Sequence, residues 1–196
     1  MIMVSYFVVM LSKLKPSSGK LLISEPFLND PNFKRSVILM TEHNDEGTLG
    51  YILNQPSLLL LKDLVPDFGQ AEFPVFIGGP VEIDTIHFVH RCYDKLNSGE
   101  KIANGIYWGG NFETLKILIN SNSISHDEVK FFLGYSGWSI GQLEQEINEN
   151  TWIVSDQFHQ DIVFSQNEEQ LWRDVIINLG PKYAHVSNFP SDPSLN

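Results

Sequence analysis

The chain has 196 residues, of which 42% are apolar, and it carries a formal net charge of -11. This length and apolar content suit a single domain with one core. The negative charge repels phosphate, which supplies most of the non-specific affinity for nucleic acid, so direct binding of DNA or RNA is disfavoured. A single cysteine, Cys92, excludes an intrachain disulfide and a zinc site built on paired thiolates. It fits a reducing compartment, so we expect a cytoplasmic protein.

The first eighteen residues stand apart from the rest of the chain. The apolar run at 1–11 has no basic stretch before it and no small-residue cleavage site after it, and it is too short to span a bilayer. We therefore predict an N-terminal extension over 1–18, a single domain over 19–186 and a flexible polar tail over 187–196. A membrane is not an expected partner.

The first half of the domain predicts short strands separated by turns. The polar cluster 42–47 separates apolar strands at 37–40 and 49–53, which indicates a hairpin with a loop longer than the two-residue minimum. An apolar run at 58–65 predicts a short helix because a serine precedes it and a proline follows it. Further strands are predicted at 21–24, 74–77, 81–84, 85–91 and 106–108, with a polar loop at 92–104.

The second half of the domain predicts helices more strongly. Asn111 is a suitable N-cap for one helix, and a longer helix begins after Asn167 and ends at Gly180. Strands at 151–154 and 161–164 are predicted between them. Short strands in hairpins with irregularly placed helices predict an α+β fold: a largely antiparallel or mixed sheet, or a flattened barrel, with flanking helices.

The most unusual composition lies at 129–154. An apolar run at 129–133 predicts a buried strand that ends at Gly134 in a glycine-rich turn, after which an amphipathic helix begins. Ser139 followed by Gln142 fits the spacing of a capping box, in which the serine hydroxyl serves as the helix cap. Ser139 therefore has a purely structural role available.

The same turn allows two chemical interpretations. Residues 137–141 read G-W-S-I-G and match the nucleophile elbow G-x-S-x-G, so a small serine hydrolase using Ser139 is one alternative. The free NH groups before a helix also favour an anion, so anion or small-ligand binding is another. The candidates for the acid and the base of the hydrolase are Asp156, Asp161, His159 and His185.

Neither a metal nor a cofactor is predicted. Residues 42–47 resemble the first half of a calcium loop, but Leu53 occupies the twelfth position, where a bidentate glutamate is needed. His87 and His90 are three residues apart on a predicted strand, so they face opposite sides.

Several blocks of this sequence resemble the AlgH family of bacterial proteins. GYSGWSIGQLEQEI, followed by Trp152, resembles the family pattern G-Y-x-G-W-x-x-G-Q-L-E-x-E. Residues 42–56 resemble E-H-N-x-x-G-x-x-G-x-x-x-N-x-P, and residues 78–81 match G-G-P-V. The resemblance covers about 19–180 and implies the family's label of transcriptional regulator.

From these patterns we predict a non-catalytic binding or regulatory domain, with no catalytic residue assigned. Its partner is expected to be an unidentified protein or a small ligand rather than nucleic acid. The glycine pair 78–79 is expected to pack beside 134–138. The candidate residues of a shared cleft are Glu42, His43, Asn54, Gly78, Gly79, Ser136, Gly137, Trp138 and Ser139.

Overall fold

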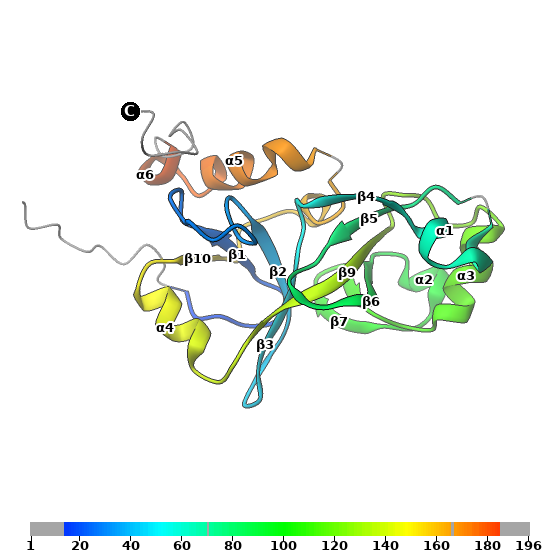
Figure 1. The fold of residues 1–196 in the computed structure, drawn as a ribbon, viewed down its shortest axis with the longest axis horizontal. Helices are drawn as coiled ribbons and strands as arrows, with labels where there is room; N and C mark the ends of the chain where they lie inside the picture. Colours follow the sequence, from blue (N-terminus) through cyan, green and yellow to red (C-terminus); the bar gives the residue numbers. More distant parts are fainter. Residues whose placement is uncertain (1–13, 70, 166, 185–196) are drawn as a thin grey trace, which may run out of the picture.

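Ten β-strands form one open sheet in the part of the chain that the structure describes (Figure 1). The structure is a computed structural model that describes residues 14–69, 71–165 and 167–184. Neighbouring strands follow the order β10-β1-β2-β3-β9-β6-β8-β7, and β4 and β5 form a branch that joins at β9. The strands are β1 (Leu21–Ser24), β2 (Val37–Asn44), β3 (Gly47–Ile52), β4 (Pro56–Leu60), β5 (Pro74–Ile77), β6 (Val81–His90), β7 (Glu100–Ala103), β8 (Ile106–Trp108), β9 (Val129–Trp138) and β10 (Trp152–Ser155).

Helices pack on both faces of the sheet, which confirms the predicted α+β fold. The pairing of β5 with β9 is parallel and the other pairings among the described strands are antiparallel. The helices are α1 (Leu61–Leu64), α2 (Tyr93–Leu96), α3 (Phe112–Asn120), α4 (Gln142–Asn148), α5 (Glu168–Asn178) and α6 (Pro181–Ala184), with 3-10 helices η1 (Pro66–Phe68) and η2 (Gln160–Ile162). None of the helices in the described ranges is long and apolar enough to cross a membrane.

Strand β9 lies at the centre of the sheet. Its first half pairs with β5 on one side and β6 on the other, and its last residues pair with β3. Because alternate residues of a strand face opposite sides, Phe131 and Phe132 belong to different apolar clusters. Strand β9 therefore joins the two ends of the molecule through one continuous backbone.

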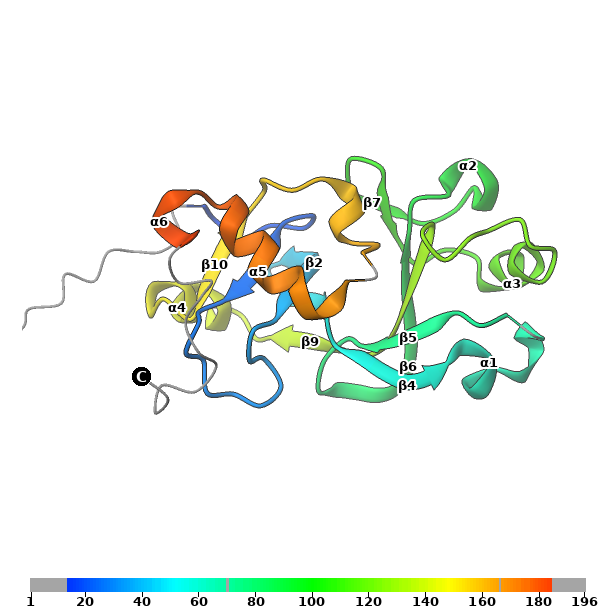
Figure 2. The same ribbon diagram turned by 90° about the horizontal axis from the view of Figure 1, so that it is seen from above.

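Three apolar clusters hold the helices against the sheet. Trp172 of α5 packs on one face of β1 and β2, and Leu143 of α4 packs on the opposite face with Trp138. Leu115 of α3 packs with Phe131 in the third cluster. Figure 2 shows α4, α5 and α6 gathered at the β10 end and α1, α2 and α3 at the other end.

The hairpin of β2 and β3 is tighter than the sequence predicts. The strands extend to Asn44 and Gly47, so the loop has two residues and the prediction of a longer loop is wrong. The Asn44 side chain accepts a hydrogen bond from the Glu46 amide at 2.8 Å, which closes the turn. A register shift between Met40 and Glu42 lets the polar residues continue the strand.

The predicted strand end at Gly134 is also wrong. Strand β9 continues through Gly134 and Gly137, and α4 begins only at Gln142. Gly134 has a φ of 64° and lies so close to the Gly79 and Val81 carbonyl oxygens that a Cβ would come within 2.8 Å of both. The glycine therefore serves close packing between strands rather than a turn.

Three further predictions are wrong in part. Residues 58–60 belong to β4, so the helix predicted at 58–65 is restricted to α1. The predicted loop at 92–104 contains α2 and β7, and the strand predicted at 161–164 is replaced by η2 and the turn after it. In each case the local pattern was short, and long-range pairing decided the outcome.

The remaining elements are confirmed. Asn111 caps α3 by accepting a hydrogen bond from the Thr114 amide at 2.8 Å. The residues predicted for 81–84 and 85–91 form one strand, β6, which is irregular between Val81 and Ile86. The segments at 1–13 and 187–196 lie outside the described residues.

Candidate functional site

The tip of the β2–β3 hairpin and the end of β9 form two clefts on opposite faces of the sheet. The first, the Tyr135 cleft, has a volume of about 470 Å³. The second, the α4 cleft, has a volume of about 580 Å³ and lies between the hairpin and α4. The Tyr135 cleft is lined by Glu42, Asn44, Glu46, Gly47, Thr48, Leu49, Val81, Tyr135, Gly137, Trp138 and Ser139. The α4 cleft is lined by His43, Asn44, Asp45, Gly47, Thr48, Ser139, Ile140, Gly141 and Glu144.

The strand alternation of β2 separates the two predicted site residues Glu42 and His43. Because they are consecutive in a strand, their side chains face opposite sides. Glu42 lines the Tyr135 cleft and His43 lines the α4 cleft, while Ser139 borders both. Glu42, His43 and Ser139 therefore gather at one end of the hairpin but serve two surfaces.

Carboxylates dominate the charge of the Tyr135 cleft. Glu42 accepts a hydrogen bond from the Asn44 side-chain amide at 2.7 Å, and Glu46 lies at the hairpin tip. No lysine, arginine or histidine is among the described residues that line this cleft. The apolar walls come from Leu49, Val81 and Tyr135.

Gly137 keeps the Tyr135 cleft open. This glycine is exposed, and a Cβ built on it would lie 3.2 Å from the Tyr135 ring and 4.0 Å from Val81. A side chain at this position would therefore occupy the space between the two walls.

His43 connects the hairpin to α4. Its Nδ1 is 2.7 Å from the Thr48 hydroxyl, and its Nε2 is 3.6 Å from the Glu144 carboxylate. His43 and Thr48 are paired across the two strands, so the contact follows from the hairpin register. The ion pair with Glu144 forms only when the imidazole is protonated.

The glycine pair packs against β9, as expected. A Cβ on Gly78 would lie 2.3 Å from the Gly134 carbonyl oxygen, and one on Gly79 would lie 2.2 Å from that of Tyr135. Ser136 is buried and donates its hydroxyl hydrogen to the Gly78 carbonyl oxygen at 2.9 Å. Gly78, Gly79 and Ser136 therefore hold strands together and line neither cleft.

Asn54 lies away from both clefts. Its side chain accepts a hydrogen bond from the Val37 amide and donates one to the Arg35 carbonyl oxygen, both at 2.9 Å. It thus fixes the entry to β2, at the opposite end from the hairpin tip.

Sequence reasoning missed Glu146, which organises the residues around Trp138. Its carboxylate accepts hydrogen bonds from the indole nitrogens of Trp138 at 2.9 Å and Trp152 at 2.7 Å. Gln142 donates a third hydrogen bond at 2.9 Å. The spacing of four residues between Gln142 and Glu146 on one helix was the available signal.

The predicted capping box is half formed. The Ser139 amide donates to the Gln142 side-chain oxygen at 3.0 Å, but the N-cap residue of α4 is Gly141 and the Ser139 hydroxyl does not serve as the cap. The extra turn residues move the helix start beyond the serine.

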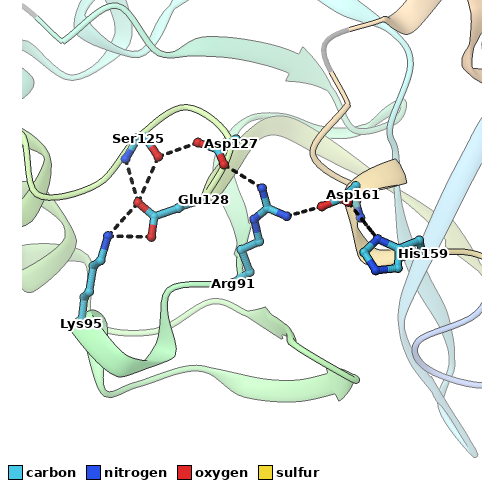
Figure 3. A network of polar contacts seen from close by, with 7 residues as sticks. All are labelled: Arg91, Lys95, Ser125, Asp127, Glu128, His159 and Asp161. Atoms are coloured by element: carbon cyan, nitrogen blue, oxygen red, sulfur yellow. Dashed lines mark hydrogen bonds and ion pairs between the residues drawn. The ribbon is translucent and has the colours of Figure 1, made fainter.

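The structure separates Ser139 from two of its proposed catalytic partners. Asp161 contacts both His159 and Arg91 (Figure 3). The Arg91 amide bonds Glu128, next to the start of β9, whereas Ser139 follows the end of that strand. Ten residues of strand separate the two groups by on the order of 30 Å. Asp156 is exposed after β10, and His185 lies outside the described residues.

The two sheet histidines are separate, as predicted. Burial lowers the pKa of both His87 and His90. His87 packs against Tyr51 and Tyr135, while His90 lies 3.7 Å from the Cys92 sulfur. In the described parts of the chain, no three histidine, cysteine or carboxylate side chains gather as a metal site would need.

Comparison with known proteins adds a family likeness over most of the chain. A family model described as DUF179, AlgH-like, matches residues 21–184. A UPF0301 protein of Chlorobium limicola is 41% identical over 184 residues, covering 94% of this chain and 97% of the relative. A UPF0301 protein of Chlorobaculum tepidum is 42% identical over 183 residues, covering 93% and 96%.

Two solved structures share the fold. A crystal structure of a protein from Corynebacterium diphtheriae has a TM-score of 0.76 at 24% identity, covering 93% of this chain and 100% of that one. The solution structure of the AlgH protein from Pseudomonas aeruginosa has a TM-score of 0.70 at 24% identity, covering 91% and 98%. At this identity the likeness concerns the fold alone.

Proposed function

Because this chain belongs to the AlgH-like family, whose model matches residues 21–184, we propose that it is a non-catalytic binding domain of the cytoplasm. Its ligand is a positively charged segment of a protein partner, held in the Tyr135 cleft. The observation that supports this is the cleft's lining, in which two carboxylates and an aromatic ring meet without a basic side chain among the described residues.

The cleft suits a lysine or arginine side chain. The carboxylates of Glu42 and Glu46 favour a cation, and the Tyr135 ring offers a cation-π contact. Leu49 and Val81 offer apolar surface to the methylene stem of such a side chain.

Regulation through this site proceeds by protein contact rather than DNA contact. The chain has a formal charge of -11, and the cleft adds carboxylates where a phosphate backbone would need cations. Carboxylates also argue against the alternative of an anion at the turn before α4. Asp45 and Glu144 line the α4 cleft at this turn and would repel an anion.

A titration followed by NMR tests the proposal. An oligoarginine peptide is expected to shift the amide signals of residues 42–49 and 135–139, while an oligoglutamate peptide of equal length leaves them unchanged. Gly137→Leu fills the cleft and should weaken binding of the arginine peptide by about tenfold or more. Ile140→Ala, which alters the α4 cleft alone, is the matched control.

Two results would overturn this assignment. One is equal binding of both peptides. The other is binding of the arginine peptide that Gly137→Leu leaves unchanged, which would place the contact elsewhere on the acidic surface.

A further inference from the structure

A lysine is buried in the sheet far from both clefts. Lys130 of β9 lies opposite Val89 of β6 and is 3% exposed. Its Nζ donates a hydrogen bond to the Ser165 carbonyl oxygen at 3.1 Å and lies 3.9 Å from the centre of the Phe76 ring. Neither contact supplies a negative charge.

The segment over this amine is residues 156–165, which we name the lid. It runs from β10 to the approach of α5 and includes η2 (Figure 2). Val163 and Phe164 of the lid are buried in the apolar cluster that includes Phe76. Gln160 packs on the turn between β7 and β8, where a Cβ on Gly105 would lie 2.3 Å from its side-chain oxygen.

An ionic latch fastens the lid to the sheet. Arg91, which follows β6, donates hydrogen bonds to Asp161 of the lid and to Asp127, next to the start of β9 (Figure 3). The Arg91 guanidinium also lies 5.0 Å from the centre of the Phe164 ring. His159 contacts Asp161 at 2.9 Å and adds charge to the latch when it is protonated.

A groove of about 400 Å³ runs between the outer rim of the lid and α5. It is bordered by Asp161, Ile162 and Ser165 on the lid side and by Leu171, Asp174, Ile177 and Asn178 on the helix side. Val163 and Phe164 pack with Leu171 and Trp172 of α5 in the apolar cluster, so the groove lies only along the outer rim of this contact. The lid buries few side chains compared with the sheet beneath it, which favours local over global opening.

We propose that the lid opens away from Lys130 while the sheet beneath stays folded, and that protonation of the amine drives this opening. Opening hydrates the ammonium group, which in the closed state has a carbonyl oxygen and a ring face as its neighbours.

The charges around Lys130 set the direction of the effect. Burial lowers the pKa of Lys130 to about 7, and Glu168 at the start of α5 opposes that shift. The flanking latch residues are Arg91, His159 and Asp161, while Phe76 and Val89 add no charge. Between about pH 7 and the ordinary lysine pKa of about 10.4, the open state binds more protons than the closed state. The equilibrium constant for closing the lid therefore increases as pH rises through this window, by up to about tenfold per pH unit.

Amine acetylation with mass spectrometry tests the lid in the full chain. The rate of acetylation of Lys130 and the rate of alkylation of Cys92 are measured in water and in sub-denaturing urea. Each rate is compared with that of the urea-unfolded chain, which gives the protection of the residue. Cys92 is fully buried between β6 and α2, so alkylation of its thiol reports wider opening of the sheet. We expect Lys130 to be less protected than Cys92 and its labelling to depend less on urea, because lid opening exposes less surface than opening of the sheet.

The latch provides a matched pair of variants. Asp161→Asn is expected to speed Lys130 acetylation about three- to tenfold, because it removes the lid's ion pair with Arg91. Glu113→Gln weakens a comparably exposed ion pair with Lys116 on α3, which has no contact with the latch, and should leave the rate unchanged.

Hydrogen exchange of the Val163 and Phe164 amides tests the proton linkage. Protection should rise above pH 7 in the wild type and stay flat in Lys130→Met. Equal protection and equal urea dependence at Lys130 and Cys92 would overturn the proposal that the lid opens while the sheet stays folded. Exchange of the wild-type lid that shows no pH dependence beyond that of Lys130→Met would overturn the role of the amine.

Discussion

The Trp138 indole donates a hydrogen bond to the Glu146 carboxylate at 2.9 Å, which ties α4 to the end of β9. Trp152 of β10 donates to the same oxygen at 2.7 Å. One carboxylate thus joins two strands that are separated in the sheet order by β1, β2 and β3. The wall shared by the two clefts depends on this arrangement, because Ser139 follows Trp138 directly.

Glu146→Ala is expected to destabilise the protein by about 2 to 4 kcal/mol. The substitution leaves two indole NH groups without an acceptor, and both rings are buried. Urea unfolding followed by tryptophan fluorescence measures the change. Glu149→Ala is the control, since its bond to Gln145 is exposed, and it should cost no more than about 0.5 kcal/mol. Equal costs for the two variants would contradict the structural role of Glu146.

Gly78→Ala is expected to lower the free energy of unfolding by about 3 kcal/mol or more. Its Cβ would lie 2.3 Å from the Gly134 carbonyl oxygen, so the backbone of β9 must move. Gly141→Ala is the comparison, because Gly141 has a φ of 76° with open space around it and should cost only about 1 kcal/mol of backbone strain. Thermal or urea unfolding of the two variants separates close approach from conformational strain.

Lys130→Met is expected to remove part of the pH dependence of global stability. Burial lowers the pKa of Lys130 to about 7, so the unfolded chain binds one more proton from there to about pH 10. The wild-type free energy of unfolding should therefore rise by about 1 kcal/mol per pH unit relative to the variant in this window. Parallel stability curves for the two proteins would show that the amine titrates normally.

Cys92 is expected to react slowly with iodoacetamide in the native protein. Burial raises the pKa of its thiol to about 11, and the side chain is fully buried. The smaller thiolate fraction alone predicts a rate about a hundredfold below that of the unfolded chain near pH 8. Labelling of the native chain at the unfolded rate would contradict the packing of α2 against β6.

A serine-directed phosphonate probe is expected to label neither the wild type nor Ser139→Ala. Arg91 holds Asp161, and Asp161 holds His159, at the other end of β9, so neither residue can activate the Ser139 hydroxyl. Intact-protein mass spectrometry detects a stoichiometric adduct directly. Labelling that requires Ser139 would restore the hydrolase alternative.

Part of the site could be predicted from the sequence. The hairpin signals brought 42–47 and 49–53 together, and the strand signal placed Trp138 and Ser139 near a helix start. The sequence did not show that Glu42 and His43 serve different clefts, because the loop prediction hid their strand alternation. It also did not exclude Asn54, whose hydrogen bonds to Val37 and Arg35 depend on β2 lying beside it.

Elements whose signals are local could be predicted from the chain alone. Asn111 caps α3 through the amide of a residue three positions away. The buried apolar residues of α5 recur every three or four positions, which is the spacing of one helical turn. Tertiary structure alone decided that Gly134 lies inside a strand and that β9 pairs with β3, β5 and β6. Such pairings join residues far apart in the chain and depend on which partners the rest of the sheet leaves open. A short window of sequence holds no information about them.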